Sequence, residues 1–146
     1  RGFSLIELLA VLLLLGLTSL IVLPAIDKGL REREVKQSAL EVAALARELR
    51  SRAVRENRPQ QIIFNLREDS YQAARGKKIM LPSQIKIAAI EGGEPLDEEF
   101  RQFLFFPNGS LLGGEVSIAA REGASTYWVL LDALTGRIAV TRGEKP

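Results

Sequence analysis

The sequence predicts an α+β protein in which one long N-terminal helix, membrane-spanning over its first half, packs on a C-terminal antiparallel β-sheet or two-sheet sandwich. Three regional patterns support this prediction. Residues 3–26 are almost continuously apolar, residues 27–58 repeat apolar residues at helical spacing, and residues 59–146 break into short strand-like runs separated by turn signals. These ranges are the expected divisions of the chain, and residues 1–2 precede them.

The composition excludes several enzyme classes. The 146 residues include no His and no Cys, and the formal net charge is +2. Without a thiolate or an imidazole the chain cannot be a cysteine protease or a Ser-His-Asp hydrolase, and it lacks the usual ligands of zinc. We therefore expect that the protein is not an enzyme and that it binds no cofactor or metal ion.

The apolar segment from Phe3 to Ile26 is long enough to cross a membrane. As a helix it would measure about 36 Å, whereas the hydrocarbon core of a bilayer is about 30 Å thick. A secretory signal peptide is one alternative, but its apolar run rarely exceeds about 15 residues, and no convincing cleavage site follows Pro24. A buried soluble helix is a second alternative, which the unbroken apolar run from Leu8 to Leu15 disfavours.

Three residues stand out within this segment. Glu7 is its only charged residue. A carboxylate at mid-bilayer costs roughly 2.5 kcal/mol or more, so that such a residue usually has a partner; the alternative is that Glu7 lies at headgroup depth. Gly16 and Pro24 both weaken a helix, Gly by about 1 kcal/mol and Pro by removing a backbone donor, which predicts a mild kink.

A second pattern continues the helix from about Asp27 to Asn57, and Pro59 stops it. Its narrow apolar stripe suits packing onto a sheet. The stripe consists of Val35, Ala39, Val42, Ala46, Leu49 and Ala53. The other faces are charged, most densely at Arg47, Arg50, Arg52, Arg55 and Arg58. These arginines could contact the phosphates of DNA, but no aromatic residue is interleaved for base stacking. We favour a solvated, ion-paired helix face and expect no nucleic-acid partner.

Seven runs after Pro59 are rich in β-branched and aromatic residues, which predicts strands. They are Gln61–Leu66, Ser70–Ala74, Gln84–Ile90, Arg101–Phe106, Glu115–Ala120, Thr126–Leu131 and Arg137–Thr141. Phe103–Phe106 is continuously apolar, which predicts a central strand covered on both faces. Asp97–Glu99 and Asp132 are the acidic candidates for chemistry, but we expect them to be a solvated loop and a turn residue, because Asp bonds its own backbone in turns.

The N-terminal motif resembles a known processing site. Arg1-Gly2-Phe3-Ser4-Leu5-Ile6-Glu7, followed by the apolar run with Gly16 and Pro24, is similar to the N termini of type IV pilins and type II secretion pseudopilins. The resemblance implies that a prepilin peptidase cuts after Gly2, so that residues 1–2 end a leader, and that it methylates the new amine of Phe3. It also implies that Glu7 neutralises the N-terminal amine of a neighbouring subunit. The helix around Gly16 and Pro24 would extend or melt during assembly.

The C-terminal half narrows this resemblance. Phe105-Phe106-Pro107-Asn108-Gly109-Ser110 and Thr135-Gly136-Arg137-Ile138 look like the pattern of the GspH and FimT family of minor pseudopilins and minor pilins, which share a pilin-like fold. The calcium-site loop of the major pseudopilin is not recognisable in this sequence.

The resemblance implies a minor pseudopilin of a type II protein secretion system, assembled at or near the tip of a periplasmic pseudopilus. It implies a single pass through the bacterial inner membrane with the β domain in the periplasm. The implied partners are the other minor pseudopilins, the major pseudopilin, the prepilin peptidase, the inner membrane and, left open, secreted cargo. Two alternatives remain: a FimT-like minor pilin of a type IV pilus, with DNA uptake as a further role, and an unrelated membrane-anchored binding domain.

Overall fold

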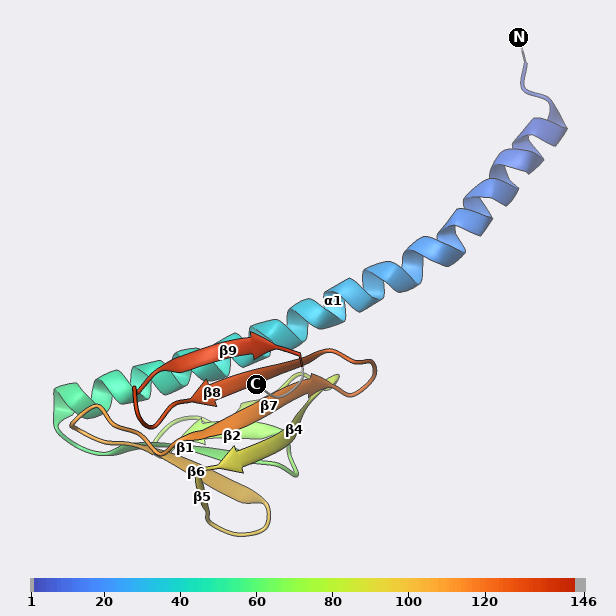
Figure 1. The fold of residues 1–146 in the computed structure, drawn as a ribbon. Helices are drawn as coiled ribbons and strands as arrows, with labels where there is room; N and C mark the ends of the chain where they lie inside the picture. The colour runs from blue at the N-terminus through green and yellow to red at the C-terminus, as the bar shows by residue number, and fades with distance from the viewer. Residues whose placement is uncertain (1, 144–146) are drawn as a thin grey trace.

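One helix runs through more than a third of the protein. The structure, a computed structural model, describes residues 2–143, except for the side chains of residues 23–25. Helix α1 (Leu5–Glu56) is continuous over 52 residues and curves gently along its length (Figure 1). It ends where Asn57 adopts a left-handed conformation, φ 49°, and Arg58 N donates to Ala53 O. The predicted stop before Pro59 is therefore correct.

Two antiparallel sheets follow the helix, as the sandwich alternative predicted. The first sheet has the order β3-β2-β1-β6-β5 and the second the order β4-β7-β8-β9. The strands of the first sheet are β1 (Gln60–Asn65), β2 (Ser70–Ala73), β3 (Ile79–Met80), β5 (Glu94–Pro95) and β6 (Phe100–Phe105). Those of the second sheet are β4 (Ile85–Gly92), β7 (Gly114–Ala120), β8 (Thr126–Leu131) and β9 (Ile138–Arg142). The sequence missed β3 and β5 because a pair of residues carries no readable alternation.

A single core lies between α1 and the two sheets (Figure 1). The predicted helix stripe is buried along its whole length, from Val35 at 0% exposure to Ala53 at 0%. Its alanines bring the helix backbone close to β8, β1, β7 and β9. From the first sheet, Phe64 meets Phe103 edge to face with ring centroids 5.9 Å apart. The small helix face and the large aromatic side chains of the sheet thus fill the core together.

The prediction that Phe103–Phe106 is covered on both faces is wrong. Phe103 and Phe105 are fully buried, whereas Leu104 and Phe106 are only partly covered. In β6 successive side chains point to opposite faces, and only the inner face of the first sheet meets the core. The continuous apolar run of β6 therefore reflects apolar side chains on both faces of the strand. It does not indicate that both faces of the sheet are covered.

Asp69, in the turn between β1 and β2, joins the two sheets. Its backbone has φ 50°, and its side chain is only 12% exposed. The carboxylate accepts a hydrogen bond from Ile87 N of β4 at 2.7 Å and pairs with the Arg121 guanidinium from the β7–β8 turn. Arg121 in turn donates from Nε to Ser83 O at 3.0 Å. One carboxylate therefore ties a hairpin of the first sheet to two segments of the second.

Candidate functional site

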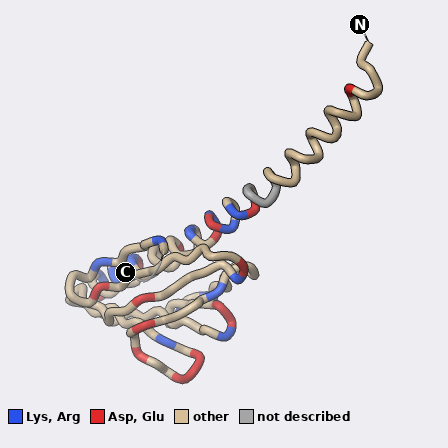
Figure 2. Tube along the Cα trace, turned by 45° about the vertical axis from the view of Figure 1, so that its right-hand side comes forward, with Lys and Arg blue, Asp and Glu red and all other residues tan. Residues whose placement is uncertain are grey.

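The apolar part of α1, described in full over residues 5–22, is exposed along its length. Its large apolar residues are widely exposed, for example Leu5 at 80% and Ile21 at 75%. In the described part of the chain, α1 is the one helix long and apolar enough to cross a membrane. Figure 2 shows this half as an almost uncharged rod, in contrast to the densely charged domain. Such a surface calls for a cover of lipid or of other apolar helices.

Glu7 lies in the first turn of α1, at the end remote from the β domain. Ser4 O accepts hydrogen bonds from the backbone amides of Glu7 and Leu8 at 3.0 and 3.1 Å, which closes that turn. The Glu7 side chain is exposed, and among the described residues it has no hydrogen-bond or ion-pair partner. The positive end of the helix dipole favours a carboxylate there by about 0.3–1 kcal/mol, which is less than the cost of a carboxylate in lipid.

The predicted processing site is open to an enzyme. Gly2 and Phe3 precede the helix in non-helical conformation, and the Phe3 side chain is 77% exposed. Arg1 lies outside the described residues. A protease needs an extended, accessible segment on both sides of the bond that it cuts, and the Gly2–Phe3 bond lies in such a segment.

Gly16 does not break the helix. The backbone is helical through Gly16 and through position 24, and a Cβ added at Gly16 would meet nothing within 4 Å. The Pro24 side chain lies outside the described residues, so a kink or melting there stays a prediction. Two hydroxyls of this half bond their own helix: Thr18 Oγ1 donates to Leu14 O at 2.9 Å and Ser19 Oγ to Leu15 O at 2.8 Å. Ser4, at the start of the helix, makes no side-chain capping hydrogen bond, and Glu7 is the charged group of this segment for which the described residues supply no partner.

The arginine-rich face divides into two parts. Arg47 and Arg50 belong to the fold: Arg47 Nη2 donates to Ile138 O at 2.9 Å, and Arg50 Nε donates to Gly109 O at 2.7 Å. The other three bond to their own helix end: Arg52 pairs with Glu48, Arg55 Nη1 donates to Ser51 Oγ, and Arg58 pairs with Glu56 at 3.2 Å. This agrees with the ion-paired face favoured from the sequence.

Arg50 also brings together the two C-terminal loop motifs that carried the resemblance. Its guanidinium lies between the Asn108-Gly109 turn and the Thr135-Gly136 turn. A Cβ added at Gly136 would lie 2.6 Å from Arg50 Nη2, and one at Gly109 would lie 3.3 Å from it. Both glycines have positive φ, +66° and +83°. Sequence analysis missed this clamp because Arg50 looked like one of five surface arginines.

The acidic candidates are turn residues. Asp132 Oδ2 accepts from Thr135 Oγ1 at 2.7 Å and Oδ1 from Leu134 N at 2.9 Å, and these hydrogen bonds lower the pKa of the Asp132 carboxyl. Asp97 Oδ1 accepts from the backbone amides of Glu99 and Phe100. Within residues 2–143, no group of three or more acidic side chains is placed to hold a metal ion.

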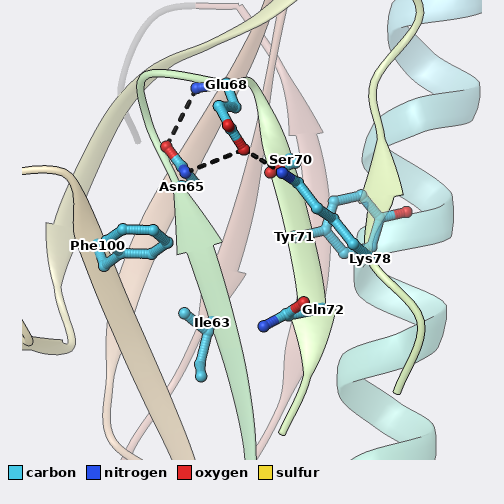
Figure 3. A pocket seen from close by; sticks show the side chains of 8 residues that line it. All are labelled: Ile63, Asn65, Glu68, Ser70, Tyr71, Gln72, Lys78 and Phe100. Carbon is cyan, nitrogen blue, oxygen red and sulfur yellow. Dashed lines mark hydrogen bonds and ion pairs between the residues drawn. The ribbon is translucent and has the colours of Figure 1, made fainter. Parts of the chain in front are cut away.

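A cavity of about 320 Å³ opens on the outer side of the first sheet. It is lined by Ile63, Asn65, Glu68, Ser70, Tyr71, Gln72, Lys78 and Phe100 (Figure 3). Its polar groups bond one another: Lys78 pairs with Glu68, and Asn65 Oδ1 accepts from Glu68 N at 3.1 Å. These contacts hold the β1–β2 turn and leave no free base beside a nucleophile.

Comparison with known proteins identifies similar proteins of type II secretion systems and of type IV pili. The chain is 23% identical over 141 residues to the Type II secretion system protein H of Xanthomonas campestris pv. campestris, which covers 93% of this chain and 83% of that protein. In structure it is similar to the minor pseudopilin EpsH from the Type 2 Secretion System of Vibrio cholerae, with a TM-score of 0.62 and 14% identity over 75% of this chain and 97% of EpsH.

A second solved structure extends the likeness to pili. The type IV minor pilin FimU of Pseudomonas aeruginosa matches with a TM-score of 0.54 and 17% identity, over 75% of this chain and 89% of FimU. No family model matches the sequence. The α+β fold predicted above is therefore the pilin-like fold of EpsH and FimU, and the resemblance to GspH-like pseudopilins is confirmed.

Proposed function

We propose that this chain is a minor pseudopilin of a type II protein secretion system, anchored in the inner membrane by the first half of α1 and assembled at or near the tip of a periplasmic pseudopilus. Its role would be structural, through contacts with the other minor pseudopilins, the major pseudopilin and secreted cargo. The prepilin peptidase would cut after Gly2 and methylate the amine of Phe3.

One observation carries this proposal. An exposed apolar helix projects from a pilin-like domain, and Glu7, a carboxylate without a partner among the described residues, lies near the free end of this helix. The similarity to a Type II secretion system protein H favours secretion over other uses of the fold. A helix of this kind can be covered by the bilayer before assembly and by neighbouring helices afterwards, and the same apolar residues serve in both states.

Glu7 would pair with the Phe3 amine of the adjacent subunit. Both groups lie at the same end of their helices, so a neighbour shifted along the filament axis by about one helical turn brings an amine beside a carboxylate. Leaving one member of such a buried pair uncompensated costs about 3–5 kcal/mol. That cost is large enough to decide whether a subunit enters the filament.

The first prediction tests this role. With Glu7→Ala or Glu7→Gln as sole copy, we expect a folded, membrane-inserted protein that fails to co-purify with the other pseudopilins, and reduced secretion. The matched control is Thr18→Val, which removes a polar group of the same segment whose hydroxyl is already bonded within the helix. Normal assembly and secretion with both Glu7 variants would overturn the proposed role, as would equal defects in the control.

The FimT-like minor pilin remains the second candidate, because FimU shares the fold. DNA uptake would need accessible cations, and Arg55 and Arg58 are exposed arginines near the distal end of α1, where they bond to Ser51 and Glu56 and hold no other part of the fold. We expect only weak binding of short DNA, falling steeply with salt. Submicromolar affinity at physiological salt, abolished by Arg55→Glu with Arg58→Glu at unchanged thermal stability, would favour the pilin instead. Arg50 is unsuited to this test because it holds two loops of the fold.

A further inference from the structure

A groove runs between α1 and the β8–β9 edge of the second sheet, at the point where the helix leaves the domain. It has a volume of about 610 Å³ and is lined by Gly29, Glu32, Arg33, Lys36, Tyr127, Val140 and Arg142. Figure 1 shows β9 running alongside α1 toward the free half of the helix. The groove is therefore on the side of the domain that faces the apolar segment.

The charges of the groove are unbalanced. It contains three cations and one acid, and that acid is already engaged: Glu32 Oε1 pairs with Arg142 Nη1 at 3.0 Å and lies 3.5 Å from the Tyr127 hydroxyl. Arg33 and Lys36 are exposed, and among residues 2–143 neither side chain has a hydrogen-bond or ion-pair partner. Two cations thus face the groove without an anion.

The cavity on the other side of the helix provides an internal comparison. It is lined by Asp27, Lys28, Arg31 and Glu122 together with small loop residues, so that two acids balance two bases. Arg31 pairs with Glu122 there at 3.0 Å. Of the two pockets beside this part of α1, the α1–β9 groove is therefore the one with an excess of positive charge.

The helix places these cations just beyond the headgroup region, with side chains that can reach back toward it. Gly29, Arg33 and Lys36 follow Ile26, the last residue of the apolar segment, by about 4, 10 and 15 Å along the axis. The interfacial region adds about 5–8 Å to each side of the hydrocarbon core. Side chains of an α-helix lean toward its N-terminus, so Arg33 and Lys36 reach back toward the apolar segment. Gly29, on the same helix face, leaves room for a ligand there.

We propose that the α1–β9 groove binds the phosphate headgroup of an anionic membrane lipid through Arg33, Lys36 and Arg142. The proposal rests on the membrane anchor of the proposed function. The guanidinium groups supply paired donors for phosphate oxygens, and the ammonium adds a point charge. Bound in this way, one lipid fixes the rotation of the β domain about the helix axis relative to the membrane surface.

The test uses the full chain in lipid nanodiscs, either of phosphatidylcholine alone or with added phosphatidylglycerol. Hydrogen exchange is followed over residues 29–36 and 138–142, and retained lipid is counted by native mass spectrometry. We expect protection and retained lipid only with phosphatidylglycerol. Arg33→Gln with Lys36→Gln should weaken the preference about thirtyfold. The matched control, Arg55→Gln with Arg58→Gln, removes the same charge from the distal end of α1 and should change nothing.

Each contrary outcome has a distinct meaning. Equal protection in both lipids, or an equal loss in the control variant, would overturn the groove while leaving the membrane anchor intact. A chain that stays out of both kinds of nanodisc would overturn the anchor and the groove together. Inorganic phosphate added to phosphatidylcholine nanodiscs separates the two sources of the anion. Protection by free phosphate equal to that by phosphatidylglycerol would show a site for a soluble anion and overturn the lipid.

Discussion

The Arg50 clamp leads to a quantitative prediction about two substitutions that lie 86 positions apart in the sequence. Arg50→Ala removes a charged hydrogen bond to Gly109 O and should lower the free energy of unfolding by about 2 kcal/mol. Gly136→Ala introduces a Cβ 2.6 Å from Arg50 Nη2, so the guanidinium must move and lose the same hydrogen bond. The left-handed φ of +66° adds a further cost of about 1 kcal/mol. We expect about 3 kcal/mol for Gly136→Ala alone.

The double variant distinguishes a clamp from two separate defects. Once Arg50 is Ala, the three atoms nearest to the Cβ of Gly136→Ala are gone, and the backbone strain is the main cost that remains. The double variant should therefore lose about 3 kcal/mol, not about 5, which is a coupling of about 2 kcal/mol. The assay is urea unfolding in mild detergent, followed by fluorescence of Trp128, the single tryptophan, which lies in β8. Arg55→Ala serves as the control and should cost less than about 0.5 kcal/mol. Additive losses would refute the clamp.

Two further stability predictions follow from the core. Asp69→Ala should lower the free energy of unfolding by about 3 kcal/mol, because it leaves Ile87 N and Arg121 without this acceptor. The control Asp97→Ala, in an exposed loop, should lower it by less than about 1 kcal/mol. Equal losses would contradict the joining role of Asp69. Burial, with a smaller contribution from Glu41, raises the pKa of Tyr71 to about 12, so the folded state keeps a proton that the unfolded state loses above pH 10. The stabilising contribution of Tyr71 is complete below pH 10, and about 2 kcal/mol of it is lost as the pH rises toward 12. The free energy of unfolding of Tyr71→Phe should therefore fall less steeply over that range than that of the unchanged protein. Parallel pH profiles of the two proteins would contradict this role of Tyr71.

The sequence predicted the elements that carry a strong period. The stripe from Val35 to Ala53 repeats over five helical turns, and its burial follows from that spacing alone. Seven strand-like runs and their turn signals predicted an antiparallel sheet or a two-sheet sandwich, and the structure has the two sheets. Phe103–Phe106 misled the prediction because both faces of β6 are apolar, and a sequence does not show which face is covered.

The site was predicted only where its residues are neighbours in the sequence. Gly2, Phe3 and Glu7 form one local motif, and the structure places them together at an exposed helix end. The Arg50 clamp and the α1–β9 groove join helix residues to loops or strands about 60 to 110 positions later. Helical spacing places Arg50 beside the apolar stripe and Arg55 on the opposite side, but it does not show which loops fold back onto Arg50. At Gly136 both the positive φ and the close approach of Arg50 favour glycine, and the second reason is visible only in the structure.

The two proposed contacts of α1 act on assembly in opposite directions. A lipid held by Arg33 and Lys36 stabilises the subunit in the membrane, because the contact is lost when the helix leaves the bilayer. The charge pair of Glu7 stabilises the subunit in the filament, because an unpaired carboxylate in an apolar surrounding is costly. Between them the stripe from Val35 to Ala53 fixes the domain to the helix, so that a displacement of the helix moves both sheets with it. Moving the helix out of the membrane would then be favourable only where the N-terminal amine of a neighbouring subunit can pair with Glu7. This would restrict the exit of the subunit from the membrane to the site of assembly.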